Sequence, residues 1–311
     1  MSADSYLIER GQRLNSISAA SDVAAAFPLL KVLRPSRETY ARLRNAVTTY
    51  IWHTLSQAFP NKTFDLTSAV LEEFRAFIAA LPNRTPNGVL LPRRQTHLSF
   101  NLVHQALADM FAQLGLLQHF SSIQAPVNIR AVTGTPEPVA DTRPYSSSKI
   151  HTDVWNGEPL ASILFNIPIL GDVDAVALQF FEPAHFPESL RKPLNDYRLG
   201  DDVVRGAAAY QTSFEMNRIY MSDGLSLHQT LKRREGLRLS IDFRAIPGIL
   251  LPGETAETSY SKAKYVATDA WRLLADTVIM VSDKPMDAFQ RAMSGERFAA
   301  VDFSTTLIES P

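Results

Sequence analysis

The stretch Lys149-Ile150-His151-Thr152-Asp153 places a histidine and an aspartate two positions apart, beside the β-rich part of the chain. Residues two apart on a β-strand project from the same face, so these side chains can reach one ion together. A second histidine, His228, follows after enough chain for several strands to fold back. Two histidines and one carboxylate are the ligands of a facial triad, which binds Fe(II) and leaves its other positions open. His151, Asp153 and His228 are therefore predicted to be metal ligands.

The segment from Gly236 to Ile246 shows the clearest alternation in the chain. One face carries Leu237, Leu239, Ile241 and Phe243, and the other carries Arg238, Ser240, Asp242 and Arg244. A period of two predicts a β-strand. Shorter β-rich runs precede it at residues 126–132, 162–169, 177–181 and 217–221. Short strands separated by turn signals predict a sandwich or a barrel.

Helical patterns flank this β-rich region. We expect one helix after a Ser36 cap, one that begins near Thr67, one from His97 to Phe120, and a helical tail from Lys262 to Phe298. The chain is thus predicted to be a single domain over residues 1–311. It would have a helical N-terminal part (1–120), a β-rich core (121–250) and a C-terminal helical extension (251–311). Residues 185–207 are charged and contain proline, as a long loop or a lid would.

Composition excludes several classes of protein. The 31 basic and 32 acidic residues give a net charge of −1, which offers no support for a nucleic-acid or anionic-membrane surface. The absence of cysteine excludes disulfides, cysteine-ligated zinc, iron–sulfur clusters and thiol nucleophiles. Residues 1–15 lack the apolar core of a signal peptide, and no apolar run approaches membrane-spanning length. A cytoplasmic protein is expected, with the apolar segment from Trp271 to Met280 as a candidate homodimer interface.

Taken together, His151-x-Asp153, His228 and Arg238-x-Ser240 resemble the Fe(II)/2-oxoglutarate-dependent dioxygenases. The longer strings at residues 151–159 and 238–244 are similar to bacterial small-molecule members associated with carbohydrate or natural-product pathways, and the match covers residues 149–244 only. The resemblance implies a mainly β fold, with a double-stranded β-helix (jelly-roll, cupin-like) core buttressed by N- and C-terminal helices. It also implies Fe(II) as the metal, with 2-oxoglutarate and O2 as co-substrates.

The resemblance also implies a binding site for the co-substrate. Arg238 lies ten residues after His228, where such enzymes place the cation for the distal carboxylate of 2-oxoglutarate, and Ser240 adds a hydroxyl on the same face. A guanidinium suits this role because it offers a fixed fork of two donors. Arg244 is the rival cation, but it lies six residues further on, about 20 Å away along an extended strand. We therefore prefer Arg238.

Other candidate site residues rest on weaker signals. Asn166 lies in an apolar run and is a candidate contact for the co-substrate. Trp155 and Asn156 follow the metal motif and are candidates for the substrate mouth, and Arg130 is a candidate contact for an anionic substrate.

The predicted function is oxidation, most commonly hydroxylation, of an unactivated C–H bond of a small molecule, with 2-oxoglutarate decarboxylated to succinate. Asp153 disfavours halogenation, because family halogenases leave that ligand position open for halide. Desaturation, cyclisation and epimerisation remain open, as does the identity of the substrate. Two other interpretations also stay open. One is a jelly-roll metalloenzyme without 2-oxoglutarate, such as a cupin-like dioxygenase or isomerase, and the other is a non-catalytic jelly-roll binding protein.

Overall fold

Two antiparallel sheets form the centre of the molecule. The computed structural model describes residues 4–65, 73–135, 143–259, 261, 264–281 and 306–309. In that part of the chain, the larger sheet has nine strands. Strand β5 (Asn128–Gly134) pairs with β11, and β3 (Val89–Leu90) pairs with the other edge of β5. The remaining strands follow the order β1 (Val23–Phe27), β2 (Leu30–Leu33), β9 (Ile219–Asp223), β6 (Ile163–Gly171), β11 (Gly236–Pro247), β4 (Phe120–Gln124) and β12 (Tyr265–Ala267).

A smaller sheet faces the larger one. It contains β10 (Leu227–Lys232), β7 (Val176–Glu182) and β8 (Ala208–Ala209), in that order. Apolar side chains from β2, β7 and β9 pack together between the two sheets, with Tyr210 and Phe214 among them. The antiparallel, sheet-rich part of the predicted fold is thereby confirmed, while jelly-roll connectivity stays a prediction.

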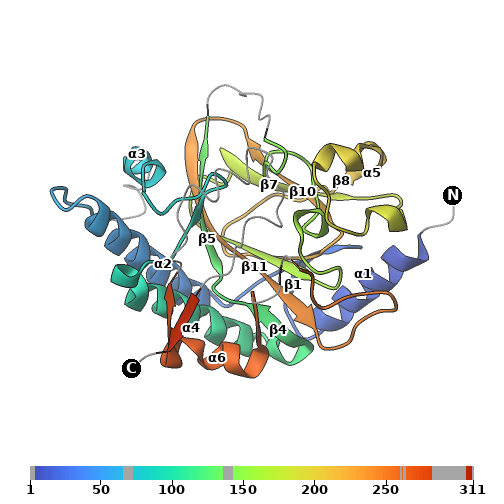
Figure 1. Cartoon of the computed structure of the whole chain (residues 1–311), viewed down its shortest axis with the longest axis horizontal. Helices are drawn as coiled ribbons and strands as arrows, with labels where there is room; N and C mark the ends of the chain where they lie inside the picture. Colours follow the sequence, from blue (N-terminus) through green and yellow to red (C-terminus); the bar gives the residue numbers. More distant parts are fainter. Residues whose placement is uncertain are drawn as a thin grey trace.

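Helices cover one side of the large sheet. Figure 1 shows α2 (Arg37–Ala58), α4 (His97–Gln113) and α6 (Thr268–Thr277) grouped there, with α1 (Ser5–Ser18) at the other end of the sheet. Two short helices, α3 (Arg75–Ala79) and α5 (Asp201–Arg205), lie further along the chain. The main core forms where buried residues of α2 and α4 meet the apolar face of β11, including Leu237, Leu239, Ile241 and Phe243. The alternation predicted for this strand is thus confirmed.

The predicted helices are confirmed in part. Ser36 caps α2 by accepting a hydrogen bond from the backbone N–H of Thr39. The helix from His97 ends at Gln113 rather than Phe120, because Gly115 takes a left-handed φ of 68° and turns the chain. Of the helix expected near Thr67, the structure describes α3; residues 66–72 lie outside the described part. Strands β1 and β2 lie in the part of the chain expected to be helical, because their short apolar runs carried no clear period.

The C-terminal segment differs from the predicted long helix. The chain leaves α6 at Thr277 and continues as strand β13 (Val278–Val281), which pairs with β14 (Thr306–Glu309), while residues 282–305 lie outside the described part. Trp271 and Met280 are fully buried in the core of this chain, so those side chains are not available to a partner. A homodimer stays a prediction. Among the described helices, none combines the length and apolar character needed to cross a bilayer.

Candidate active site

A pocket lies between the two sheets, and most of the predicted site residues line it. Seven of the nine do so: Arg130, His151, Asp153, Asn156, Asn166, His228 and Arg238. Further lining comes from Asn87, Tyr145, Ser147, Leu164, Leu178, Tyr197, Thr230, Asp242 and Arg244. Ser240 and Trp155 are not part of the lining.

The two histidines are joined through their backbones. His151 and His228 exchange N–H···O bonds of 3.0 and 2.9 Å, and their ring centroids are 4.5 Å apart. The Nδ1 of His151 lies 2.7 Å from the carbonyl of Lys149, and the Nδ1 of His228 lies 3.3 Å from that of Ser226. Because a carbonyl only accepts, each Nδ1 carries the proton and each Nε2 keeps a lone pair. This is the arrangement typical of metal-binding histidines.

Both imidazoles are held in the neutral form. Burial lowers the pKa of His151 to about 3 and also lowers the pKa of His228. A metal ligand must be unprotonated, so this shift favours binding of a cation.

Asp153 reaches the pocket from a turn rather than from a strand. It caps a short 3-10 helix, Val154–Asn156, in a helical backbone conformation, and only His151 makes a β-bridge. The expected strand geometry for this pair is therefore wrong, although the turn still brings Asp153 Oδ1 to 3.9 Å from His228 Nε2. Burial would raise the pKa of Asp153, but the adjacent Arg244 guanidinium holds it below the ordinary value, so the carboxylate is ionised.

The donor set of these three residues fits a divalent ion after a small movement. Neighbouring ligands of an octahedral ion lie about 3 Å apart, given bonds of about 2.1 Å. The 3.9 Å separation between Asp153 and His228 exceeds this spacing. Accordingly, no three histidine, cysteine or acidic side chains of the described residues are gathered closely enough to hold a metal as they stand. A movement of about 1 Å that closes the gap between the His228 ring and the carboxylate would bring the two to a ligand's spacing.

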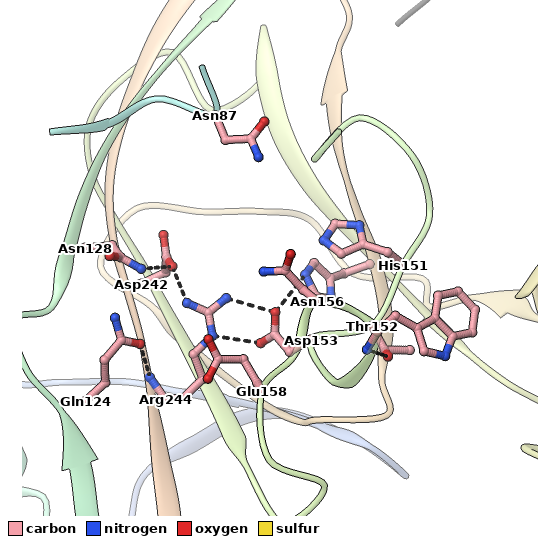
Figure 2. A network of polar contacts seen from close by, with 12 residues as sticks. Asn87, Gln124, Asn128, His151, Thr152, Asp153, Asn156, Glu158, Asp242 and Arg244 are labelled. Atoms are coloured by element: carbon pink, nitrogen blue, oxygen red, sulfur yellow. Dashed lines mark hydrogen bonds and ion pairs between the residues drawn. The ribbon is translucent and has the colours of Figure 1, made fainter. Parts of the chain in front are cut away.

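Arg244 contacts the predicted metal ligand directly. Its guanidinium donates to both oxygens of Asp153, at 3.0 Å from Nε and 2.8 Å from Nη2, and to Asp242 at 2.8 Å (Figure 2). Arg244 therefore lines the pocket as well, although we preferred Arg238 as the cation for the co-substrate. The two arginines are separated along β11, but the loop that carries Asp153 crosses the strand at Arg244.

Arg238 lies in the same pocket without an anionic partner. Only 1% of it is exposed, its Nη1 donates to the carbonyl of Val176 at 3.1 Å, and its guanidinium lies 5.1 Å from the ring centre of Phe214. Among the described residues, no carboxylate forms an ion pair with it, and its Nε has no hydrogen-bond partner. Burial lowers the pKa of Arg238 to about 9, so it is still a cation at neutral pH.

Two other polar side chains, one on β11 and one on β6, are also unsatisfied. The Ser240 hydroxyl and the Asn166 carbonyl oxygen are buried without a partner in the described part of the chain. Buried polar atoms without partners are unfavourable, and a buried unpaired cation is more so. Arg238 and the Ser240 hydroxyl can both donate and therefore fit a ligand that brings a carboxylate, whereas the Asn166 oxygen needs a donor.

Of the two substrate-mouth candidates, the structure supports one. Trp155 is fully buried in a second apolar cluster, and its indole N–H donates to the carbonyl of Leu190 at 2.9 Å. Its ring packs so closely on Gly200 that a Cβ there would collide with it, so Trp155 anchors the loop instead of lining the pocket. Asn156 does line the pocket, and its Oδ1 accepts from the Tyr197 hydroxyl at 3.2 Å.

Several lining residues were missed from the sequence. Asp242 and Arg244 stand on the polar face of β11, so the alternation itself was the signal that could have found them. Tyr145 and Tyr197 lie in irregular segments, where no period indicates which side chain points inward. The segment predicted as a loop or lid holds short helical turns and α5, and it packs against the site through Phe186 and Tyr197.

No protein-family model matches this sequence, and no curated protein matches it significantly. Solved structures do resemble it. One is AviO1 from Streptomyces viridochromogenes Tue57, with 13% identity and a TM-score of 0.40 over 77% of this chain and 97% of that chain. Another is SnoN, a non-heme alpha ketoglutarate dependent epimerase from nogalamycin biosynthesis, with 10% identity and a TM-score of 0.33 over 81% of this chain and 92% of that chain.

A third is an N-substituted L-amino acid dioxygenase from Burkholderia ambifaria AMMD in complex with alpha-KG. It shares 10% identity and a TM-score of 0.35 over 75% of this chain and 87% of that chain. The second and third descriptions name alpha-ketoglutarate, which is the 2-oxoglutarate of the sequence resemblance. Because the identities are this low and the TM-scores are below 0.5, the likeness assigns neither a reaction nor a substrate to this chain.

Proposed function

We propose that this chain is a non-haem Fe(II)/2-oxoglutarate-dependent oxygenase that hydroxylates an unactivated C–H bond of a small molecule. One observation carries the proposal. The pocket that contains two histidines with free Nε2 atoms and an ionised aspartate also contains Arg238, a buried cation with which no carboxylate of the described residues forms an ion pair. A metal site alone has no need for this second feature, whereas a keto acid supplies both a chelating end for a metal and a distal carboxylate for the arginine.

In this proposal His151, Asp153 and His228 hold the metal. Bound Fe(II) supplies the redox chemistry by which O2 oxidises the substrate while 2-oxoglutarate is decarboxylated to succinate and CO2. The residues of the chain bind and orient. Arg238 would bind the distal carboxylate, and the buried hydroxyl of Ser240, two residues further along β11, would donate to it once its side chain turns toward the pocket. Asn166 would take part through its amide nitrogen, because its oxygen only accepts.

The charges of the pocket support a dianionic co-substrate. Three arginines, Arg130, Arg238 and Arg244, outnumber two aspartates, Asp153 and Asp242, by one positive charge in the described lining. A divalent ion would raise this excess to three, which is unfavourable in a buried site. A dianion such as 2-oxoglutarate returns the excess to one.

Two aliphatic side chains of the pocket would contact the carbon chain that joins the two ends of the co-substrate. Leu164 and Leu178 are the aliphatic side chains of the described lining, and Leu178 stands opposite Thr230 in the small sheet. They would cover the carbon chain of the keto acid and keep water from the ion pair with Arg238, which strengthens it. Elsewhere in the lining, Asn87, Asn156 and Tyr197 would offer hydrogen-bonding groups to the primary substrate.

An anaerobic titration with Fe(II) and 2-oxoglutarate tests the proposal, because the chelate of these two gives a weak visible charge-transfer band. We expect the band with the unaltered protein, and succinate once a substrate and O2 are added. Metal binding without the band would indicate a metalloenzyme that does not use 2-oxoglutarate. Absence of metal binding would indicate a non-catalytic protein, and either result would overturn the proposal.

A further inference from the structure

Arg244 is the centre of a buried network that ends on a predicted metal ligand. Figure 2 shows its guanidinium between Asp153 on one side and Asp242 on the other. Nε and Nη2 are used by the two oxygens of Asp153, and Nη1 is used by Asp242. The backbone N–H of Arg244 donates to Gln124 Oε1 at 3.2 Å. Hydrogen bonds therefore fix both the guanidinium and the backbone of Arg244.

Asp242 is itself held by the neighbouring strand β5. Arg130 donates to both of its oxygens, at 2.6 Å from Nε and 3.2 Å from Nη2, and Asn128 donates to Oδ1 at 3.0 Å. In the sheet register Asp242 lies opposite Asn128. The direction of the Arg244 guanidinium is thus set by the strand pairing of β11 with β5.

We infer that Arg244, aimed by Asp242, is the positioning residue that fixes the carboxylate of Asp153 for metal binding. This inference rests on the proposed function, in which Asp153 is a ligand. A planar fork that contacts both carboxylate oxygens fixes the plane of the carboxylate as well as its place. Oδ1 then keeps one lone pair on the side of His228, and binding through both oxygens at once is blocked.

The charges of the network suit this role. A lone cation next to a divalent ion would repel it, but Asp242 offsets the charge of Arg244 within 2.8 Å. Asp242, which Arg130 also contacts, thus reduces the repulsion between Arg244 and the ion, and the main contribution of Arg244 is geometry. A lysine has a single ammonium on a flexible stem and cannot contact Asp242 and both oxygens of Asp153 in this way.

Cobalt(II) is a suitable probe, since its visible absorption reports affinity and coordination geometry without turnover. We would titrate the full chain anaerobically and compare Arg244→Lys with Arg238→Lys, which changes the same residue type on the same face of the same strand. Arg244→Lys should weaken Co(II) binding by about 10- to 100-fold, as loss of a partner of a metal ligand typically does, and should change the shape of the band. Arg238→Lys should keep the Co(II) affinity within about twofold and weaken 2-oxoglutarate binding instead.

Chemical rescue separates positioning from a general loss of structure. In Arg244→Ala, added guanidinium ion should restore part of the Co(II) affinity, and ammonium at equal ionic strength should not. Melting curves followed by circular dichroism would show whether each variant is folded. If Arg244→Ala is not folded, the Co(II) titration of Arg244→Lys is the deciding measurement. Unchanged Co(II) affinity in folded Arg244→Lys would overturn this inference and leave the proposed function standing. Failure of the unaltered protein to bind Co(II) would instead overturn the proposed function.

Discussion

The phenol ring of Tyr197 lies parallel to the imidazole of His151, with 4.6 Å between the ring centres and 4° between the planes. Only 3% of Tyr197 is exposed, and Tyr145 meets its ring edge-on. The hydroxyl is tied to Asn156, next to the metal motif. A segment outside both sheets therefore fixes the tilt of a predicted metal ligand.

Replacing Tyr197 should separate the effects of its ring and its hydroxyl. Tyr197→Ala should lower the free energy of unfolding by about 3–5 kcal/mol, because it leaves a large cavity in a buried aromatic cluster. It should also weaken Co(II) binding, because the imidazole of His151 loses the surface that orients it. Tyr197→Phe keeps the ring and should cost about 1 kcal/mol for one lost hydrogen bond. Urea unfolding and Co(II) titration measure both effects. Equal metal affinity in the two variants would contradict the orienting role of the ring.

Replacing Arg238 by methionine should have effects of opposite sign on stability and on co-substrate binding. The ligand-free protein should become more stable, because an unpaired buried cation is replaced by an apolar side chain of similar length. Affinity for 2-oxoglutarate should fall by about 100-fold or more, since the loss of a buried charge partner is typically worth at least 2–3 kcal/mol. Thermal melts with and without 2-oxoglutarate measure both. A variant that is less stable and still shifts its melting temperature with 2-oxoglutarate would show that Arg238 is structural.

His104 should make the protein sensitive to acid. It is fully buried, its Nε2 lies 2.7 Å from the carbonyl of Trp271, and burial lowers its pKa to about 4 from the ordinary value of 6.5. Above pH 6.5 the imidazole is neutral whether folded or unfolded, so its titration has no effect on stability. As the pH falls from about 6.5 to 4, the unfolded chain takes up the proton first, and stability should fall by about 3 kcal/mol from this residue.

Urea unfolding across pH 4.5 to 7.5 tests this acid sensitivity. The stability of His104→Gln should fall less steeply below pH 6.5 than that of the unaltered protein. His119→Gln, at a half-exposed position, serves as the control for loss of a histidine elsewhere. Parallel pH profiles for the unaltered protein and His104→Gln would contradict the assignment.

Truncation of Arg10 should lower the free energy of unfolding more than truncation of most other side chains of helix α1. It is fully buried, and it donates to Asp223 at 2.7 Å, to the carbonyl of Leu160 at 2.6 Å and to Glu254. Arg10→Ala leaves two buried carboxylates short of a partner, which should lower the free energy of unfolding by about 3–5 kcal/mol.

An exposed arginine provides the comparison. Arg34 pairs with Asp22 where both side chains are about half-exposed, so Arg34→Ala should cost less than about 1 kcal/mol. Asp223 also accepts from the backbone N–H of Leu225, in the turn that leads to His228. Arg10→Ala should therefore also weaken Co(II) binding, and an unfolding energy like that of Arg34→Ala would show that the buried network is not stabilising.

The parts of this molecule with a strict period could be predicted from the sequence. The alternation in β11 predicted which side chains enter the core and which face the pocket, and the Ser36 cap predicted the start of α2. The strand alternation and the helix cap follow from local geometry, which repeats along a strand or a helix. That Arg238 and His228 share a pocket was implied by the family resemblance instead.

The parts that depend on packing between distant segments could not be predicted. Spacing along β11 gives the distance from Arg238 to Arg244, but it does not say which loop crosses the strand at Arg244. The stacking of Tyr197 on His151 arises from a segment with no regular period. Trp155 looked like a pocket residue because it follows the metal motif, yet the short 3-10 turn after Asp153 sends its ring into the opposite cluster.

Strand β11 is paired on both sides and buried on both faces, and in our proposal one of those faces carries the cations for the co-substrate and for the metal ligand. A substitution on the polar face of this strand would alter the proposed oxidant site, and one on its apolar face would alter the core directly behind that site. The side chains that remain for the primary substrate, such as Asn87, Asn156 and Tyr197, come from turns and irregular segments instead. In our proposal, the groups that hold the oxidant thus stand on the most constrained strand of the sheet, and the groups left for the primary substrate stand on segments that can change without disturbing that strand.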